Sequence, residues 1–513
     1  MKTFRISARH SDLARLQAYR VGDSLKARVS GIETQYNFRA SLGDINQQDP
    51  LWKMPEKGVF TEDFLKDLRE GSAEMVVHSW KDLPTEPRPE TQIVATLPRA
   101  DVRDLLLFRK DRFASAKANG HVKVLTSSPR RAHNLAEFMK THLPFAVAEV
   151  QFENVRGNIP TRLKKLLSQD VDAIIVAKAA IDRLLGSPEE EFLETRDLIK
   201  SVLNQTLFMV LPLSVNPTAA AQGALAVEIS REREDVRDAL SAINCEATFR
   251  SVEKERKILA SYGGGCHQKI GVNVLLRPYG ELLFLRGLTD AGEVLDRVQL
   301  TPSRPPTPAV SEAEIFPRAG EEANFFDRED VGREAWAWAE GQPLLWVARE
   351  NAWPSGFRPR KDAIIWTAGL RTWRKLAQRG VWVSGSAESL GEEEPTRLEY
   401  LLGAPGGAGD LKWVKLTHVQ SAESRGASEM KACGTYRLVP KMAGPSLKGR
   451  THFYWMSGSS FDRAVELYPE IRNAHHAAGP GLTARHLETA LGSQAQVSVF
   501  LNVESWRKAV LAR

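Results

Sequence analysis

The sequence predicts an α/β protein built from several domains, and three observations indicate this. The chain has 513 residues, enough for roughly three to four domains of ~150 residues each. In the first half, short apolar runs alternate with amphipathic helical patterns, as in parallel sheets covered by helices. A proline-rich stretch at 301–311 lacks an apolar period and separates this half from a second half that alternates in the same way.

The first half predicts two α/β domains. Strand patterns lie at residues 4–9, 75–80, 122–128, 150–155 and 173–180. A helix is expected from about Ser11 to Arg28, and another follows the strand at 122–128. We expect one domain at 1–97 and a second at 98–200, with segment 201–218 returning to complete the first sheet. The chain would then pass between the two domains twice, and these two crossings would form a hinge.

The remaining chain divides into a small domain, a linker and a larger region. Residues 219–300 contain a long helical pattern and then alternating strands at 270–276, 281–288 and 294–300, which predicts an α+β domain. Residues 301–311 are the linker. Residues 312–513 alternate strand and helix again, with strand patterns at 343–349, 363–369, 452–458 and 497–502. We expect a two-lobed α/β region there.

Composition limits the environment and the class of partner. Hydrophobic residues at 42% and charged residues at 26% are ordinary for a folded soluble protein, and the formal net charge is +6. Three cysteines are too few for a disulfide framework or a thiolate zinc site, so no metal is expected and a reducing compartment is favoured. The sequence has neither a signal-peptide core nor a run of ~20 apolar residues. We expect a cytoplasmic monomer without membrane contact.

Polar and basic residues of the first half gather where the predicted strands end. Ser128 followed by Pro129 predicts the start of a helix. At the carboxyl ends of parallel strands, helix N-termini offer free N–H groups to anions, and arginine adds a planar donor fork. The sequence therefore predicts a crevice for a multiply anionic ligand. The residues of this set are Arg9, Ser11, Ser128, Arg130, Arg131, Arg156, Arg162 and Arg183.

Two further motifs carry reactive groups. VVHSWKDLP places Ser79, Lys81 and Asp82 at the end of a buried strand, where a carboxylate could stabilise a cation or move a proton. A salt bridge is the simpler interpretation of that carboxylate. SYGGGCHQKIG puts three glycines before Cys266, as expected where a large group approaches the sulfur. A tight turn with an incidental cysteine is the alternative.

Other classes of protein remain open on these observations. A noncatalytic hinged anion-binding protein would not need Cys266. A thiol-dependent transferase would use the cysteine without a covalently attached cofactor. A nucleic-acid binder would be expected to carry a helix-turn-helix, a zinc finger or an aromatic RNA-binding signature, and the sequence has none of these. We therefore expect no nucleic-acid partner.

Residues 3–300 resemble the hydroxymethylbilane synthase family, also called porphobilinogen deaminase. The resemblance rests on SARHSDLARLQA, KGVFTEDF, VVHSWKDLP, LTSSPRRAHNLAE, VRGNIPTRL, AAAQGALAVE and GGGCHQKIG, in that order. It implies two domains like those of a hinged periplasmic binding protein and a third that carries a dipyrromethane cofactor. In AAAQGALAVE, Ala221 stands where the family usually has glycine.

The resemblance also implies the reaction and the residues that serve it. The family joins four porphobilinogen molecules head to tail, releases ammonia at each step and frees a linear tetrapyrrole by hydrolysis. Asp82 would stabilise the azafulvene cation formed on deamination, with Lys81 and Arg9 beside it. Cys266 would hold the cofactor through a thioether. The other cofactor contacts would be Ser79, Lys81, Asp82, Ser128, Arg130, Arg131 and Gly157. The substrate contacts would be Arg9, Ser11, Phe60, Arg156, Arg162 and Arg183.

Residues 316–513 are similar to uroporphyrinogen-III synthase, through IIWTAGLRTWRKLAQRGVWV, HFYWMSGSSFDRAVEL and HHAAGPGLTARHLETALG. The resemblance implies a cleft between two α/β lobes that closes hydroxymethylbilane with inversion of its last ring. A degenerate, inactive lobe is the alternative, as is ordinary helix capping by the threonines. The candidate cleft residues are Gly369, Thr372, Tyr436, Ser457, Ser459, Ser460, Gly479 and Thr483.

Overall fold

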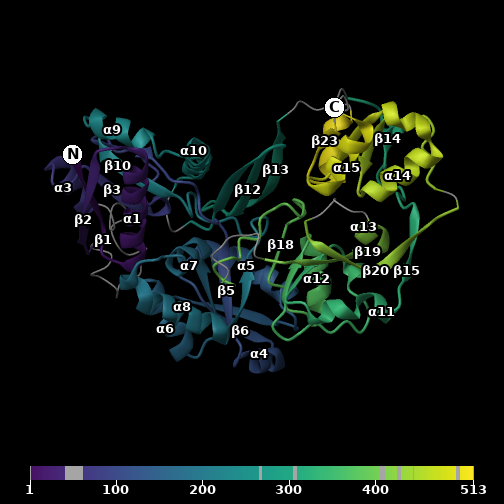
Figure 1. Ribbon diagram of the computed structural model, residues 1–513, viewed down its shortest axis with the longest axis horizontal. Coiled ribbons are helices and arrows are strands. Elements are labelled where there is room, and N and C mark those ends of the chain that lie inside the picture. The colour runs from purple at the N-terminus through teal and green to yellow at the C-terminus, as the bar shows by residue number, and fades with distance from the viewer. Residues whose placement is uncertain are drawn as a thin grey trace. The chain divides into compact units, whose positions relative to one another are not determined.

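A computed structural model describes residues 2–40, 62–264, 268–303, 309–403, 411–423, 429–442, 444–492 and 497–511. The chain divides into two compact units (Figure 1). The first unit comprises Met1–Leu276, Leu283–Val298 and Tyr400–Pro405. The second comprises Arg277–Leu282, Gln299–Glu399 and Gly406–Arg513. Both contain α/β sheets, which confirms the predicted multidomain α/β class.

The first unit begins with a sheet of order β2-β1-β3-β10-β4. Its strands are β1 (Lys2–Arg9), β2 (Ile32–Arg39), β3 (Met75–Ser79), β4 (Thr91–Ala95) and β10 (Leu225–Ser230). Strands β2 and β3 lie parallel to β1, whereas β10 lies antiparallel to both β3 and β4. In β1, Phe4, Ile6 and Ala8 are buried at every second position, as the strand period requires.

Helices cover both faces of this sheet. They are α1 (Asp12–Arg28), α3 (Glu62–Arg69) and α9 (Glu234–Ser241), and a short 3-10 turn, η2 (Trp80–Asp82), follows β3. Val21 of α1 and Leu240 of α9 pack in one cluster with Met75, whereas Phe64 of α3 packs on Val76. Because neighbouring side chains of a strand point to opposite faces, α1 and α9 cover one face and α3 the other.

The second sheet of the first unit has the order β7-β6-β8-β5-β9. Its strands are β5 (Asp104–Arg109), β6 (His121–Leu125), β7 (Glu149–Glu153), β8 (Ala173–Ala177) and β9 (Thr206–Val210). The helices between them are α4 (Phe113–Asn119), α5 (Pro129–His142), α6 (Ile159–Ser168), α7 (Lys178–Leu185), η3 (Glu190–Phe192) and α8 (Leu193–Gln205). Strand β6 lies parallel to β7 and β8, and β5 lies antiparallel to β8 and β9.

The strand that returns to the first sheet is not the one expected. Segment 201–218 was predicted to complete that sheet, but its strand β9 pairs with β5 of the second sheet. The chain crosses back only after β9, and β10 inserts between β3 and β4. Both strands are apolar runs, so periodicity alone does not say which sheet each one joins. The two crossings are therefore β4 to β5 and β9 to β10.

A helix and a three-stranded sheet follow. They are α10 (Glu246–Ser261), β11 (Gly271–Arg277), β12 (Gly280–Leu288) and β13 (Val294–Pro302). Val272, Leu285 and Leu295 of the three strands form one buried cluster, against which Ile258 and Leu259 of α10 pack. These residues form the predicted α+β layer, except that the turn Arg277–Leu282 belongs to the second unit.

The second unit holds two sheets. One has the order β15-β20-β19-β16-β17-β18 and the other β14-β21-β22-β23. The strands are β14 (Ile315–Phe316), β15 (Phe326–Asp330), β16 (Leu344–Val347), β17 (Ile364–Thr367), β18 (Gly385–Ser386), β19 (Val414–His418), β20 (Lys431–Pro440), β21 (His452–Trp455), β22 (His475–Ala478) and β23 (Val497–Val499). The two sheets agree with the predicted two-lobed region.

Helices pack on both of these sheets. They are α11 (Arg333–Trp336), α12 (Leu370–Gln378), α13 (Val419–Glu423), α14 (Gly458–Leu467), α15 (Leu482–Leu491) and α16 (Val503–Val510), with 3-10 turns η4 (Glu312–Glu314), η5 (Ala337–Gly341), η6 (Glu350–Ala352) and η8 (Pro469–Asn473). Trp455 packs with α14 and α15, whereas its neighbour Tyr454 packs with α16. In the described part of the chain, no helix has the length and apolarity to cross a membrane.

Candidate active site

The motif VVHSWKDLP ends strand β3 and forms the turn η2. Trp80 is buried, and its backbone N–H donates to the carbonyl of Ala224 at 3.1 Å. Arg256 of α10 donates to the carbonyl of Leu83 at 3.1 Å. These bonds fix the turn from both sides. Lys81 is partly exposed and Asp82 is exposed at the carboxyl end of the strand.

Several predicted basic residues come close enough to change one another's ionisation. Loss of water around its ammonium lowers the pKa of Lys81, and the positive charges of Arg131 and Arg162 add to the effect. Burial also lowers the pKa of Arg162 to about 10, and Arg131 and Arg156 act in the same direction. Asp82 opposes both shifts. The structure thus brings Lys81, Asp82, Arg131, Arg156 and Arg162 into one group with an excess of positive charge.

Arg130 and Arg131 are buried and are held by one carboxylate, that of Asp104. Arg131 donates to its two oxygens at 3.0 and 2.7 Å, and Arg130 donates to Oδ2 at 3.0 Å. The two guanidinium groups hold the pKa of Asp104 well below its usual range, against the effect of burial. Arg130 also donates to Asn216 Oδ1 at 2.8 Å. This network fixes where the two guanidinium groups lie.

Sequence reasoning missed Asp104 and its partner Gln222. The Gln222 amide donates to Asp104 Oδ1 and to the carbonyl of Val102, each at 2.8 Å, and its Oε1 accepts from Lys81 at 3.4 Å. Gln222 therefore links the VVHSWKDLP motif to the arginine pair. An aspartate that opens an otherwise apolar strand, as in DLLLF, was the available signal, since a buried carboxylate needs a partner.

Two predicted site residues, Ser128 and Gly157, lie at helix N-termini. Ser128 caps α5, and its Oγ accepts the backbone N–H of Arg131 at 3.4 Å. Gly157 has φ +111°, and a Cβ there would lie 2.7 Å from Thr161 Cγ2, so the position requires glycine. The carbonyl of Gly157 accepts from Arg162 Nε at 2.7 Å. This bond orients a predicted substrate-binding arginine.

The other predicted residues of the first unit lie at strand and helix ends. Arg9 is the last residue of β1, and Ser11 precedes α1. Ser79 Oγ accepts from Gln17 at 3.3 Å. Arg183 in α7 is buried and donates to the carbonyl of Gly223 at 2.6 Å. Arg183 thus contacts the segment that leads into β10.

Cys266 and Phe60 lie outside the described residues, but the approach to the cysteine is described. Gly264, two residues earlier, has φ +63°, and a Cβ there would lie 2.4 Å from Thr85 Oγ1. Thr85 is three residues beyond Asp82. Gly264 therefore lies directly beside the loop that follows the VVHSWKDLP motif. Within the described ranges, no group of three or more His, Cys, Asp or Glu side chains could hold a metal ion.

In the second unit, most of the predicted residues lie just beyond the carboxyl ends of strands or at the starts of the helices that follow, whereas Tyr436 lies within β20. Ser457 caps α14, and its Oγ lies 2.9 Å from Ser460 Oγ. Gly369 precedes α12, where a Cβ would lie 2.6 Å from Ser389 Oγ. Tyr436 is buried in β20. Thr372 is mostly buried in α12, Ser459 lies in α14, Gly479 follows β22 and Thr483 lies in α15.

Two contacts bring the sheets of the second unit together at these ends. Arg349, beyond β16, donates to the carbonyl of Met456, beyond β21, at 3.2 Å. Gly391 and Gly481 approach so closely that a Cβ on Gly391 would lie 2.8 Å from the Cα of Gly481. Tyr436 and Ser457 therefore lie where the two sheets face each other.

The sequence did not predict the positive charges that lie beside Tyr436 and His418. Burial raises the pKa of Tyr436, and Arg349 and Arg328 oppose the shift. Burial lowers the pKa of His418, and Arg349, Lys415 and Arg328 add to the effect. Arg328 and Arg349 carried no signal in the sequence because they lie in different strand neighbourhoods, one in β15 and one beyond β16.

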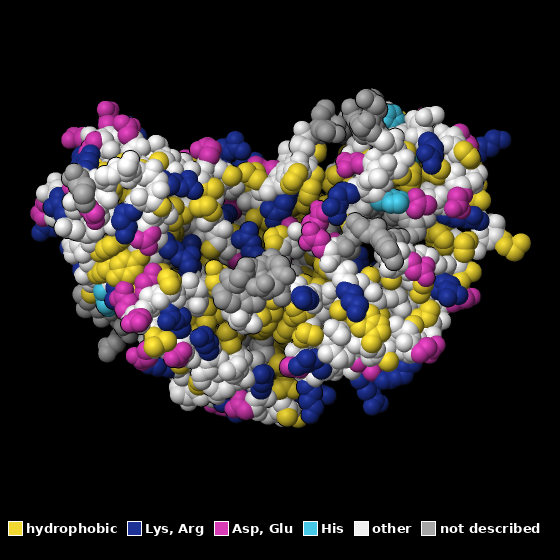
Figure 2. Space-filling model, viewed as in Figure 1, with side chains coloured by type: hydrophobic (Ala, Val, Ile, Leu, Met, Phe, Trp, Pro, Cys, Tyr) yellow, Lys and Arg dark blue, Asp and Glu magenta, His cyan; other side chains and the backbone are white. Residues whose placement is uncertain are grey.

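The basic excess is not concentrated on the face seen in Figure 2. Lys and Arg side chains there are interspersed with Asp and Glu side chains over the described surface. A protein that binds a nucleic-acid backbone gathers its cations into a patch or stripe. The visible face has mixed charge instead.

Comparisons with known proteins agree on one family. The family model described as porphobilinogen deaminase, dipyromethane cofactor binding domain, matches residues 4–238. A porphobilinogen deaminase from Syntrophomonas wolfei is 33% identical over 288 residues, which cover 56% of this chain and 85% of that protein. A probable porphobilinogen deaminase from Thermoplasma volcanium is 34% identical over 277 residues, which cover 54% and 82%.

Among solved structures, the similarity is lower. A putative sulfonate ABC transporter protein, the periplasmic sulfonate-binding protein SsuA from Methylobacillus flagellatus, is 14% identical, with a TM-score of 0.25. The match covers 51% of this chain and 69% of that chain.

Proposed function

Because the chain belongs to the porphobilinogen deaminase family, we propose that its first unit joins four porphobilinogen molecules head to tail, releases ammonia at each step and frees hydroxymethylbilane by hydrolysis. One observation carries the assignment to particular residues. Asp82 lies exposed at the end of β3 in a group that also contains Lys81, Arg131 and Arg162. A carboxylate surrounded by cations suits a substrate that carries carboxylates and develops positive charge as ammonia leaves.

The matched domain is the one that binds the dipyrromethane cofactor in this family. When bound, that cofactor supplies the two-pyrrole primer on which the chain of rings is built. The described residues fit it, because the excess of cations over carboxylates would bind its acid side chains. Cys266 would hold it covalently, and the close approach of Gly264 to Thr85 supports that role. The remaining contacts would be Ser79, Lys81, Asp82, Ser128, Arg130, Arg131 and Gly157.

The chain's own groups would bind and orient porphobilinogen. Its acetate and propionate would be bound by Arg9, Ser11, Arg156, Arg162 and Arg183, with Phe60 beside the ring. Asp82 would accept a hydrogen bond from the pyrrole N–H and stabilise the cation left by ammonia. Lys81, whose pKa is lowered by loss of water and by its cationic neighbours, would give up its proton more readily than an ordinary lysine and could move a proton at the site.

The intact mass of the purified protein tests the covalent anchor. We expect the unaltered chain and a Cys245→Ser control to carry extra mass equal to two pyrrole units, and a Cys266→Ser variant to lack it. Cys245 is the matched control because it lies before α10, next to Thr248 and outside the glycine run. An unmodified mass for the unaltered chain from pyrrole-replete cells would favour the hinged anion-binding alternative.

A second activity is favoured by the facing sheets of the second unit. We propose that this unit acts as a uroporphyrinogen-III synthase and closes hydroxymethylbilane with inversion of its last ring. The contact between Arg349 and the Met456 carbonyl supports this, because it brings Tyr436, Ser457 and two arginines to one edge. Backbone N–H groups, hydroxyls and guanidinium groups there would bind the carboxylates of the linear tetrapyrrole.

The porphyrin isomer formed from porphobilinogen tests this second activity. After oxidation, the type III isomer is expected from the unaltered chain, and mostly type I from a Tyr436→Phe, Ser457→Ala double variant. Porphobilinogen consumption should stay unchanged in that variant, which serves as the internal control. Type I alone from the unaltered chain would show that the second unit is a degenerate lobe.

A further inference from the structure

Helix α1 links the two sheets of the first unit. We call the sheet β2-β1-β3-β10-β4 with its helices the first lobe, and the sheet β7-β6-β8-β5-β9 with its helices the second lobe. Helix α1 belongs to the first lobe, and it packs against α7 of the second lobe (Figure 1). The turn η3 and the start of α8 also contact it. These contacts join the lobes in addition to the two crossings of the chain.

One carboxylate at the start of α1 is bonded from both lobes. Thr195 Oγ1, in α8, donates to Asp12 Oδ2 at 2.5 Å. Arg15, one turn along α1, donates to Asp12 Oδ1 at 2.8 Å. Thr195 is buried, and the side chain of Asp12 is 29% exposed. Both carboxylate oxygens are thus engaged, and one of them by the second lobe.

Arg15 also contacts the second lobe directly. Its Nη1 pairs with Glu191 of η3. Its guanidinium lies over the ring of Phe192, 5.0 Å from the ring centroid, and Phe192 is fully buried. Burial raises the pKa of Tyr19, one turn further along α1, to about 12, and a hydrogen bond from Tyr19 to Glu191 adds to the effect. Glu191 therefore holds two side chains of α1.

These contacts form one network between the lobes, which we call the lobe latch. Its side chains are Asp12, Arg15 and Tyr19 on the first lobe and Glu191, Phe192 and Thr195 on the second. The second-lobe side is itself fixed, because Arg196 donates to the carbonyl of Glu189 at 3.1 Å, just before η3. A single exposed ion pair contributes little, whereas a network with buried members holds a defined geometry.

The latch acts on the segment that precedes it. Ser11 is bonded to α1 through its backbone, since the N–H of Arg15 donates to the Ser11 carbonyl at 2.9 Å. The side chain of Ser11 makes no capping bond with α1, so the helix does not occupy its hydroxyl. Arg9, two residues before Ser11, is the last residue of β1. The distance from Arg9 and Ser11 to the second lobe is therefore set by the latch.

We propose that Asp12 and Arg15 are positioning residues for porphobilinogen. The inference rests on the proposed function, which assigns carboxylate binding to Arg9 and Ser11 on the first lobe and to arginines of the second lobe. A ligand with two carboxylates needs both sets of groups at a defined separation. The latch sets this separation before the substrate binds, which lowers the cost of binding.

Steady-state consumption of porphobilinogen by the full-length protein tests the latch. Arg15→Gln and Thr195→Val each remove a bond between the lobes, and valine keeps the shape of the buried threonine. We expect each change to raise KM about fivefold. The kcat should change by less than about twofold, because separate bonds fix the turn η2. A fall in kcat as large as the rise in KM would overturn the proposal, since it would indicate a loss of structure at that turn.

A double variant tests the pairing of Arg15 with Glu191. Glu191→Gln combined with Arg15→Gln should raise KM by less than the product of the two single effects, because each single change already breaks the pair. Effects that multiply would show that the two residues act independently and would contradict the latch.

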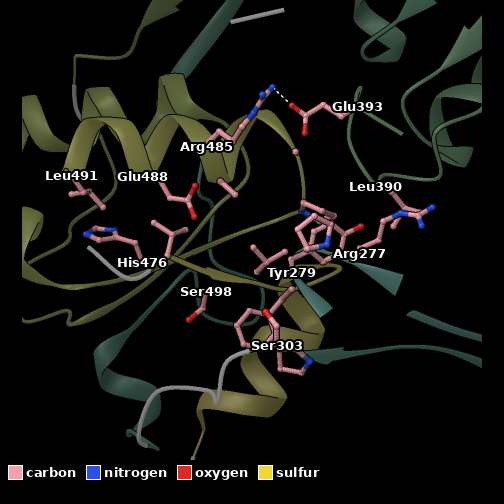
Figure 3. Close-up of a pocket in the computed structure, with 18 of the residues that line it drawn as sticks. Arg277, Tyr279, Ser303, Leu390, Glu393, His476, Arg485, Glu488, Leu491 and Ser498 are labelled. Carbon is pink, nitrogen blue, oxygen red and sulfur yellow. Dashed lines mark ion pairs between the residues drawn. The ribbon is translucent and has the colours of Figure 1, made fainter. Parts of the chain in front are cut away.

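Two exposed ion pairs outside the latch provide matched controls. Lys26 pairs with Asp23 on the same helix α1, at 2.9 Å. Arg485 of α15 pairs with Glu393 in the second unit, beside the cavity shown in Figure 3, where a dashed line marks the pair. Lys26→Gln and Arg485→Gln should leave KM unchanged. A rise in KM as large as that of Arg15→Gln would indicate a nonspecific effect of charge and would overturn the proposal.

Hydrogen exchange followed by mass spectrometry detects the latch without turnover. Arg15→Gln should speed amide exchange severalfold both in residues 12–20 and in residues 190–196, since each segment protects the other. Faster exchange in only one segment would show that the contact does not join the lobes. Normal consumption with an unchanged KM in both latch variants overturns the latch alone. If no preparation consumes porphobilinogen, the proposed function fails, and the substrate role of the latch fails with it.

Discussion

Nη2 of Arg131 lies 2.7 Å from Oδ1 of Asp104, and both side chains are buried. The same carboxylate also accepts from Arg130 and from Gln222. A single buried acid at the start of β5 therefore positions two arginines that we expect to bind the cofactor. Its removal should affect folding as well as ligand binding.

Asp104→Asn should lower the free energy of unfolding by about 3–5 kcal/mol, because it leaves two buried guanidinium groups without their counter-ion. Urea denaturation followed by tryptophan fluorescence measures this. Asp111→Asn is the control, since Asp111 is largely exposed where it pairs with Arg109, and should change stability by less than about 1 kcal/mol. Equal midpoints for the two variants would contradict the role given to Asp104.

Lys81 should react with acylating reagents at a lower pH than an ordinary lysine. Loss of water around the ammonium and its arginine neighbours lower its pKa, so a larger fraction is uncharged and nucleophilic at pH 8. Competitive labelling with acetic anhydride, read by peptide mass spectrometry between pH 6 and 10, measures this. Lys66, whose side chain is 69% exposed, provides the reference. A Lys81 profile that coincides with that of Lys66 would refute the prediction.

Asp182 should make the first unit less stable as the pH rises. Burial raises its pKa to about 6, despite the nearby cation of Lys178, while Asp101 acts in the same direction as burial and Arg103 against it. Between its unfolded value of 3.8 and 6, the folded state binds more protons than the unfolded state, so stability falls as the pH rises through this range.

The Asp182→Asn variant tests this effect. Its loss of unfolding free energy between pH 4 and pH 7 should be smaller than that of the unaltered chain by about 2–3 kcal/mol. Asp197→Asn, at an exposed position of α8, should leave the pH dependence unchanged. Parallel curves for the unaltered chain and Asp182→Asn would rule out Asp182 as the group responsible.

Lys415 and Glu392 form a buried ion pair in the second unit, each with a side chain 7% exposed. Glu392→Gln should cost about 3–5 kcal/mol, because it leaves the Lys415 charge buried without its partner. Replacing both, as Glu392→Leu with Lys415→Met, should restore most of the stability, since two apolar side chains of similar volume need no partner. A double variant as unstable as the single one would mean that the pair has further structural partners.

Local patterns predicted the individual elements well. The cap at Ser128 and the proline at the start of α5 were both expected from the sequence, and helix α1 covers the predicted range. Such features depend on neighbouring residues, so a short stretch of sequence contains the information. The prediction that segment 201–218 completes the first sheet was wrong because it depended on distant residues. β9 and β10 are both apolar, and only their long-range pairing distinguishes them.

The sequence predicted the arginines of the charged network but not the side chains that hold them in place. Arg130 and Arg131 were identified because they follow a strand and a helix cap, but their partner Asp104 lies 26 and 27 residues away in the sequence. Gln222 is farther still, 118 residues from Asp104. Pairings at such separations depend on the completed fold. Cys266 and Phe60 remain predictions, because they lie outside the described residues.

The place of β10 has a consequence for how the protein is made. β10 fills the gap between β3 and β4, yet the whole second sheet separates it from β4 in the chain. During synthesis, the edge of β3 that pairs with β10 therefore stays unpaired until residues 225–230 have left the ribosome. An unpaired strand edge invites association with other chains. We expect nascent chains that stop before Leu225 to need a chaperone, and chains that extend past Ser230 to lose that need.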